Sequence, residues 1–153
     1  MTATDAYREL IAAAWSLTGT EILAGDAEPL DGETDQFLSV NREALERARQ
    51  ALWRRCQVPL RYEPEFFEKQ CENYRPLRNL ARSFAIELRA AVRTTDLTRA
   101  VDNGLDIFHL ANAVRRGGLV TDVLVAISIE GIAIDQTRRI RRRLKADQAT
   151  RLA

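Results

Sequence analysis

LRNLARSFAIELRAAV, residues 77–92, is the stretch that decides the fold. Its apolar residues recur at intervals of three and four, the period of an amphipathic α-helix. The next stretch, Leu97–Arg116, keeps the same period, and Arg93–Asp96 between them is short enough to turn the chain back. The sequence therefore predicts an antiparallel pair of helices, with Thr95 or Asp96 capping the second one.

The helical period continues outward from this pair in both directions. We expect earlier helices over residues 7–15, from Ser39 or Asn41 to the residue before Pro59, and from Pro64 to a break at 74–76. Between the first two, residues 26–34 contain Pro29, Gly32 and several acids, which predicts an exposed acidic loop. Gly117-Gly118 ends the helix that begins at Leu97, and another helix is expected from Leu119 as far as Leu144.

No segment shows the alternating period of a β-strand, so the predicted fold class is all-α. A chain of 153 residues with 46% hydrophobic and 29% charged residues is typical of one globular domain. We expect a single helical domain over 1–153, built from five or six helices in antiparallel hairpins. A basic helix or tail over residues 138–153, with a short helix from about Asp147, would complete it.

Several functional classes are excluded or disfavoured by composition. The chain has too few ligands for a structural zinc site, since it contains only Cys56, Cys71 and the single His109, so we expect no metal. No cofactor-binding motif is present, so we expect no cofactor. The most apolar stretch, residues 119–134, is interrupted by polar residues and is expected to be a core helix instead of a membrane span. We expect a cytoplasmic protein, with the alternative that the chain is part of a longer or exported one.

The helical pair carries a resemblance to a known family. The stretch TDLTRAV, residues 95–101, is similar to the turn into the second helix of a tetratricopeptide (TPR) repeat, with Ala100 at the small position where the helices cross. Residues 82–115 thus resemble a degenerate TPR hairpin, in which Leu88 and Ile107 stand where the family has small residues. The longer run 80–134 also resembles uncharacterised bacterial helical proteins. The resemblance implies a stack of helical hairpins and a role in protein interaction.

The acids near His109 give the candidates for chemistry. Asp102, Asp106 and His109 are spaced to share one helical face, which suits a general base or half of a bundle metal site. The alternative is a solvated polar face. Glu87 and Glu130 lie in apolar sequence, so they form either a carboxylate pair in one cavity or separate ion pairs with arginines. We assign no catalytic residue.

Charge and aromatic residues give the candidates for binding. Residues 1–37 carry eight acids against Arg8, whereas Arg138–Lys145 is strongly basic. This run could contact nucleic-acid phosphates, form a solvated helix end, or dock the acidic N-terminal third. The aromatic residues Trp15, Trp53 and Phe66-Phe67 are expected in the core or lining a groove, and an exposed one would indicate a partner surface.

The function we predict is that of a non-catalytic helical module for protein–protein interaction, acting on another protein or on a second copy. The alternatives are nucleic-acid binding through Arg138–Lys145 and, less favoured, an enzyme that uses His109 with its neighbouring acids. We expect a groove between the helices at 77–92 and 119–144. The candidate partner-binding residues are Asn103, Asp106, His109, Asn112, Arg138, Arg139 and Arg142.

Overall fold

The computed structural model describes residues 2–23, 31–54, 56–59, 63–144 and 150. Throughout these residues the regular secondary structure is helical, which confirms the predicted all-α class. The elements in chain order are α1 (Ala3–Trp15), the 3₁₀ turn η1 (Thr20–Leu23), α2 (Asp31–Val40), α3 (Arg42–Leu52), α4 (Pro64–Arg93), α5 (Leu97–Arg115), α6 (Val120–Ile140) and the 3₁₀ turn η2 (Arg141–Arg143).

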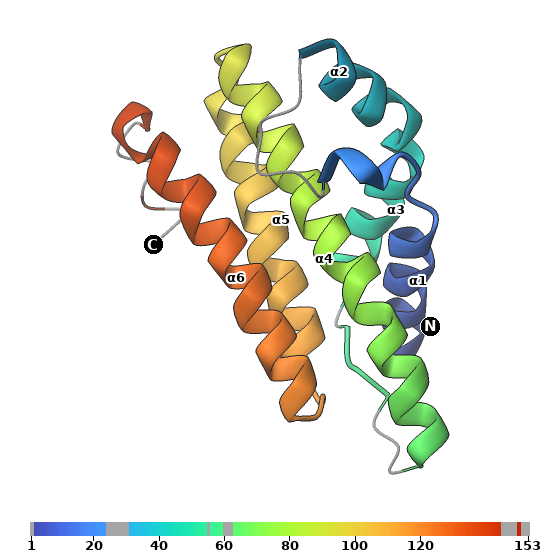
Figure 1. Ribbon diagram of the computed structural model, residues 1–153. Coiled ribbons are helices and arrows are strands. Elements are labelled where there is room, and N and C mark those ends of the chain that lie inside the picture. The colour runs from blue at the N-terminus through green and yellow to red at the C-terminus, as the bar shows by residue number, and fades with distance from the viewer. Residues whose placement is uncertain (1, 24–30, 55, 60–62, 145–149, 151–153) are drawn as a thin grey trace.

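The long helix α4 organises the molecule (Figure 1). α5 and α6 pack against it and against each other as successive antiparallel helices. α1 and α3 pair with each other on another side of α4, and α2 crosses near its C-terminal end. The expected stack of antiparallel hairpins is therefore present. None of the described helices is long and apolar enough to cross a membrane.

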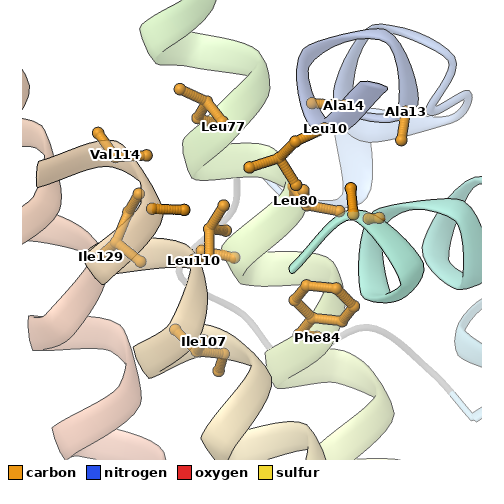
Figure 2. Close-up of a cluster of buried hydrophobic side chains, with 14 of the residues drawn as sticks. Leu10, Ala13, Ala14, Leu77, Leu80, Phe84, Ile107, Leu110, Val114 and Ile129 are labelled. Atoms are coloured by element: carbon orange, nitrogen blue, oxygen red, sulfur yellow. The ribbon is translucent and has the colours of Figure 1, made fainter. Parts of the chain in front are cut away.

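The core is built on the face of α4 that the sequence predicts (Figure 2). Leu77, Leu80 and Phe84 are fully buried and meet Leu10 of α1 and Leu110 of α5. Burying an aliphatic or aromatic side chain of this size contributes about 2 kcal/mol relative to leaving it in water. Because one helix supplies residues to contacts with α1, α3, α5 and α6, these elements are held as one unit.

The turn between α4 and α5 forms where it is expected. Thr95 adopts a left-handed backbone conformation with φ of 61°, which reverses the chain. The Asp96 side chain then accepts a hydrogen bond from the Arg99 backbone N–H at 3.0 Å and caps α5. Ala100 is fully buried with Leu88 and Ala91, so the small residue does lie where α4 and α5 pack together.

The expected break at residues 74–76 is wrong. α4 continues through Pro76, which is buried inside the helix. Proline removes one backbone hydrogen bond, but contacts on both sides of it hold the helix in place. Asn73 accepts a hydrogen bond from the Trp15 indole of α1 at 2.9 Å, and Leu77 begins the buried core. Packing therefore outweighs the local helix-breaking preference.

The expectations for residues 26–41 also need correction. Residues 31–34 form the first turn of α2 instead of a loop, while 26–30 lie outside the described residues. Acidic residues favour the positive end of a helix, which explains how an acidic segment forms a first turn. Ser39 lies inside α2. The Asn41 side chain makes no capping hydrogen bond to α3; it accepts from the Thr18 N–H and donates to the Thr18 carbonyl, at 2.8 and 2.9 Å.

The C-terminal expectations are met in outline. α6 begins one residue after Leu119 and ends at Ile140, and a single 3₁₀ turn carries the chain to Leu144. Gly117 has the expected left-handed conformation, with φ of 77°. Within the helices, Gly104 of α5 is buried, whereas Gly131 of α6 is exposed, and a Cβ added at Gly131 would have no neighbour within 4 Å. The short helix expected from Asp147 lies outside the described residues.

Candidate functional site

A groove runs between α3 and α5, and we call it the α3–α5 groove. It consists of two adjoining hollows of about 330 and 260 Å³ that share Trp53 and His109 as a common wall. Arg49 and Asn103 lie in the larger hollow. The other lining residues are Glu46, Arg99, Asp102, Leu105 and Asp106 in the larger hollow, and Leu52, Arg54, Cys56, Asn112, Ala113 and Arg116 in the smaller one.

Trp53 stands at the centre of this groove with 80% of its surface exposed. It is the C-cap residue of α3, and its ring meets that of His109 edge to face, with 6.2 Å between centroids and 64° between planes. Trp53 therefore lines a groove, as expected, but it is not part of the core. An exposed tryptophan keeps a large apolar surface in water, which is the feature that indicates a partner surface.

The base of the groove is an ion-pair cluster centred on Arg49. Its Nε donates to Asp106 Oδ2 of α5 at 2.8 Å, and its guanidinium also donates to Glu87 of α4. The same group donates to Asn103 Oδ1 at 2.9 Å and lies 5.1 Å from the centre of the Phe84 ring. One arginine thus joins three helices and fixes the position of the groove wall.

Burial sets the charge balance of this cluster. Burial raises the pKa of Glu87 and that of Asp106, because desolvation of each carboxyl outweighs its attraction to Arg49. Burial disfavours the charge on Arg49, but Glu87 and Asp106 more than offset this and raise its pKa. Arg49 stays charged at every ordinary pH, so the cluster always contains its cation.

The Asn103 side chain has an unused hydrogen-bond donor that is buried in the wall of the groove. The residue is only 2% exposed, and its side-chain oxygen accepts from Arg49. Its Nδ2 finds no acceptor among the described residues. A buried N–H without an acceptor costs about 1–3 kcal/mol, so this donor lowers the stability of the groove wall.

The structure brings four of the seven candidate binding residues together. Asn103, Asp106, His109 and Asn112 all line the α3–α5 groove. We expected these residues in a groove between the helices at 77–92 and 119–144, and this expectation is wrong. The side of α5 that carries them faces α3, while α6 packs against another side of α5. Arg49 is a site residue that the sequence did not predict, because an arginine on a helix is ordinarily expected at the surface.

The other three candidates, Arg138, Arg139 and Arg142, lie at the C-terminal end of α6 and in η2, and all three are largely accessible to solvent. Arg139 pairs with Asp135 one turn earlier, at 3.2 Å. It also lines a third hollow, of about 300 Å³, between α2, α4 and α6. There Arg93 of α4 forms ion pairs with Asp31 and Asp35 of α2, so an arginine outside the basic run holds this acidic helix.

Three of the acids singled out for chemistry, Glu87, Asp106 and Glu130, have arginine partners. Glu87 pairs with Arg49 and Arg99, and Glu130 of α6 pairs with Arg115 at 2.5 Å, so the ion-pair alternative holds for both. Asp106 is likewise committed to Arg49. Within the described part of the chain, no group of three His, Cys, Asp or Glu side chains is placed to hold a metal ion.

Comparisons of the chain with protein-family models, curated proteins and solved structures found no match. The likeness of residues 82–115 to a TPR hairpin therefore stays a prediction. What the fold and the groove define is an all-helical protein whose α3–α5 groove combines an exposed tryptophan, a histidine and a buried amide donor.

Proposed function

We propose that the protein is a non-catalytic helical module that binds a segment of a partner protein in the α3–α5 groove. The observation that carries this proposal is Trp53, which is 80% exposed and is held against His109 in the wall of the groove. Tryptophan is enriched among the few residues that supply most of the energy of protein interfaces. Its contact with His109 restricts the ring before binding, so less side-chain freedom is lost when a partner covers it.

The polar groups of the groove indicate what such a segment carries. An apolar side chain suits the face of Trp53, and an acidic side chain suits the smaller hollow, where Arg54 and Arg116 lie. The Arg49 cluster holds the wall in place and reduces the rearrangement that binding requires.

Nucleic-acid binding remains the alternative. The arginines at 138, 139, 141, 142 and 143 all reach the surface. Arg138, Arg141 and Arg142 have the spacing of one helical face, whereas Arg139 and Arg143 lie about 100° or more around from Arg138. The run 138–145 contains no aromatic side chain on which a base could stack, and we therefore place this function second. The third alternative uses His109, but Asp106, the acid one turn before it, is paired with Arg49.

Affinity capture from a lysate of the source organism tests the proposal. The wild-type protein is compared with Trp53→Ala and with Phe67→Ala, which removes a partly exposed aromatic residue on α4, away from the groove. We expect the wild type and Phe67→Ala to retain the same proteins after nuclease treatment and Trp53→Ala to lose them. Equal capture by all three would contradict the proposal. Capture that disappears with nuclease would favour the basic run.

A further inference from the structure

The outward face of α6 is unusually apolar. Val120, Leu124, Ile127 and Ile134 are 77, 60, 52 and 43% exposed, respectively. Among the described residues, each of the other helices exposes at most one large hydrophobic side chain within its bounds. Gly131 lies between Ile127 and Ile134, and a Cβ added there would meet no atom within 4 Å, so none of the described residues covers this part of the helix.

The spacing of these residues is that of a coiled-coil seam. Positions 120, 124, 127, 131 and 134 are separated by four, three, four and three residues, the heptad pattern of a and d positions. The inward side of α6 is already used: its buried residues, among them Ala126, Ile129 and Ala133, pack against the rest of the molecule. α6 therefore has a second apolar stripe, which we call the α6 seam.

We propose that the α6 seam pairs with the α6 seam of a second copy of the chain, antiparallel, in a two-fold symmetric dimer. When two such helices run in opposite directions with a positions facing d positions, Gly131 lies opposite Ile127 of the second copy and Leu124 lies opposite Ile134. The residue without a side chain then faces a branched one. This small-to-large match lets the helices approach closely and makes the seam complementary to itself.

The charges of α6 favour the antiparallel arrangement. Arg138 and Arg139 lie in its last turn, and Arg141, Arg142 and Arg143 follow directly. A parallel pair would bring these arginines of the two copies together. In an antiparallel pair the two basic ends are separated by the helix length of about 30 Å, well beyond the screening length of about 10 Å at 0.1 M salt.

The size of the seam sets the strength of the dimer. The exposed parts of its four large side chains amount to roughly 400 Å² per copy, within the range of patches that mark interaction sites. A stable interface buries about 800 Å² per partner, so the seam supplies about half and flanking polar residues the rest. We expect a dissociation constant on the order of 10 μM.

In Figure 1 α6 and α3 lie on opposite sides of the α4–α5 pair, so the dimer leaves the α3–α5 groove open.

Sedimentation equilibrium over a range of protein concentrations tests the dimer. The wild type is expected to change from monomer to dimer, and Ile127→Glu and Leu124→Glu are each expected to weaken the dimer at least tenfold. Val40→Glu is the matched control, because it places the same charge on an exposed hydrophobic residue of α2. Circular dichroism verifies that each variant folds. A wild type that stays monomeric at about 100 times the expected dissociation constant, or a folded Ile127→Glu variant that dimerises normally, overturns the proposal.

Cysteine cross-linking tests the direction of the pair. In a Cys71→Ser background, with Cys56 buried, chains carrying Leu124→Cys are mixed with chains carrying Ile134→Cys. The antiparallel pair predicts cross-links between the two kinds of chain and none between copies of a Val120→Cys chain. Self-cross-linking of Val120→Cys would overturn the antiparallel arrangement. The Trp53→Ala variant is expected to remain dimeric, and the Ile127→Glu variant is expected to retain the partners that the α3–α5 groove captures. A failure of the dimer proposal and a failure of the groove proposal can therefore be distinguished.

Discussion

Arg49 of α3 donates a hydrogen bond to Asp106 of α5, with 2.8 Å between Nε and Oδ2. The same side chain also pairs with Glu87 of α4, so a single cation lies between two buried carboxylates from different helices. Removing the cation would leave both carboxylates without their main partner. This relationship makes the cluster under the α3–α5 groove both a structural link and a sensitive point.

We expect Arg49→Met to destabilise the protein by about 3–5 kcal/mol, because it leaves buried carboxylates uncompensated. Arg47→Met is the control: Arg47 pairs with Glu9 at 3.3 Å on the surface, and an exposed pair contributes about 1 kcal/mol or less. Urea unfolding followed by circular dichroism measures both. The triple variant Arg49→Met, Glu87→Gln, Asp106→Asn should recover part of the loss. Equal stabilities of Arg49→Met and Arg47→Met would contradict this role.

The raised pKa of Glu87 predicts a pH dependence. A carboxyl whose pKa is higher in the folded than in the unfolded chain binds more protons when folded, so its contribution to stability increases as pH falls between the two values. Glu87→Gln removes this contribution. We expect the variant to lose most stability relative to wild type near pH ~4 and least near pH ~7. Urea unfolding at both pH values measures the difference, and a loss that is larger at neutral pH would show that the Arg49 attraction dominates.

The Arg49 cluster also shows what the sequence could and could not predict. The buried face of α4 follows from periodicity, because burial of Leu77, Leu80 and Phe84 depends on spacing within one helix. The partner of Glu87 depends on how α3 packs against α4 and α5, which spacing does not encode. The unusual position of Glu87 in an apolar stretch was a usable signal that a cation must face it, but not of which arginine.

Two local preferences gave wrong boundaries for the same reason. Pro76 and the acids near residue 31 normally end helices or occupy loops, yet both lie in helices here. At Pro76, the Trp15–Asn73 hydrogen bond and the core at Leu77 hold the chain. At α2, Arg93 of α4 binds Asp31. Each of these contacts comes from a distant part of the chain, and the helical propensity of neighbouring residues cannot report it.

Two glycines should respond oppositely to alanine. Gly131 lies in the exposed interior of α6, and a methyl group added there would have no atom of the same chain within 4 Å, so Gly131→Ala should stabilise the monomer by about 0.5–1 kcal/mol. At Gly118, an added Cβ would lie 2.5 Å from the Asp122 Cβ and displace that residue. Asp122 accepts from the Leu119 N–H at 2.7 Å and caps α6, so Gly118→Ala should lower the melting temperature. Thermal unfolding followed by circular dichroism at about 1 μM, below the dissociation constant expected for the α6 dimer, measures the contrast in the monomer. A lower melting temperature for monomeric Gly131→Ala would contradict the open space around this residue.

The buried phenol of Tyr7 predicts a change in stability at alkaline pH. Tyr7 accepts a hydrogen bond from the Gln70 amide at 2.8 Å, and burial raises its pKa above the ordinary value. Tyr7→Phe removes this acceptor from the buried Gln70 N–H and should destabilise the protein by about 1–2 kcal/mol at neutral pH.

Above pH ~10 the phenol of the unfolded wild type ionises while folded Tyr7 keeps its proton, so wild-type stability falls with pH and the loss caused by the substitution becomes smaller. Tyr74 provides the comparison, since burial raises its pKa to about 12 and its hydroxyl bonds to Thr121 at 2.9 Å. Tyr74→Phe should likewise reduce the fall of stability at alkaline pH. At neutral pH it should lower the free energy of unfolding by less than Tyr7→Phe does, because Thr121 is only partly buried. Guanidinium unfolding of the three proteins from neutral to alkaline pH measures these slopes. Parallel curves for wild type and Tyr7→Phe would mean that the Tyr7 phenol ionises equally in the folded and unfolded chain.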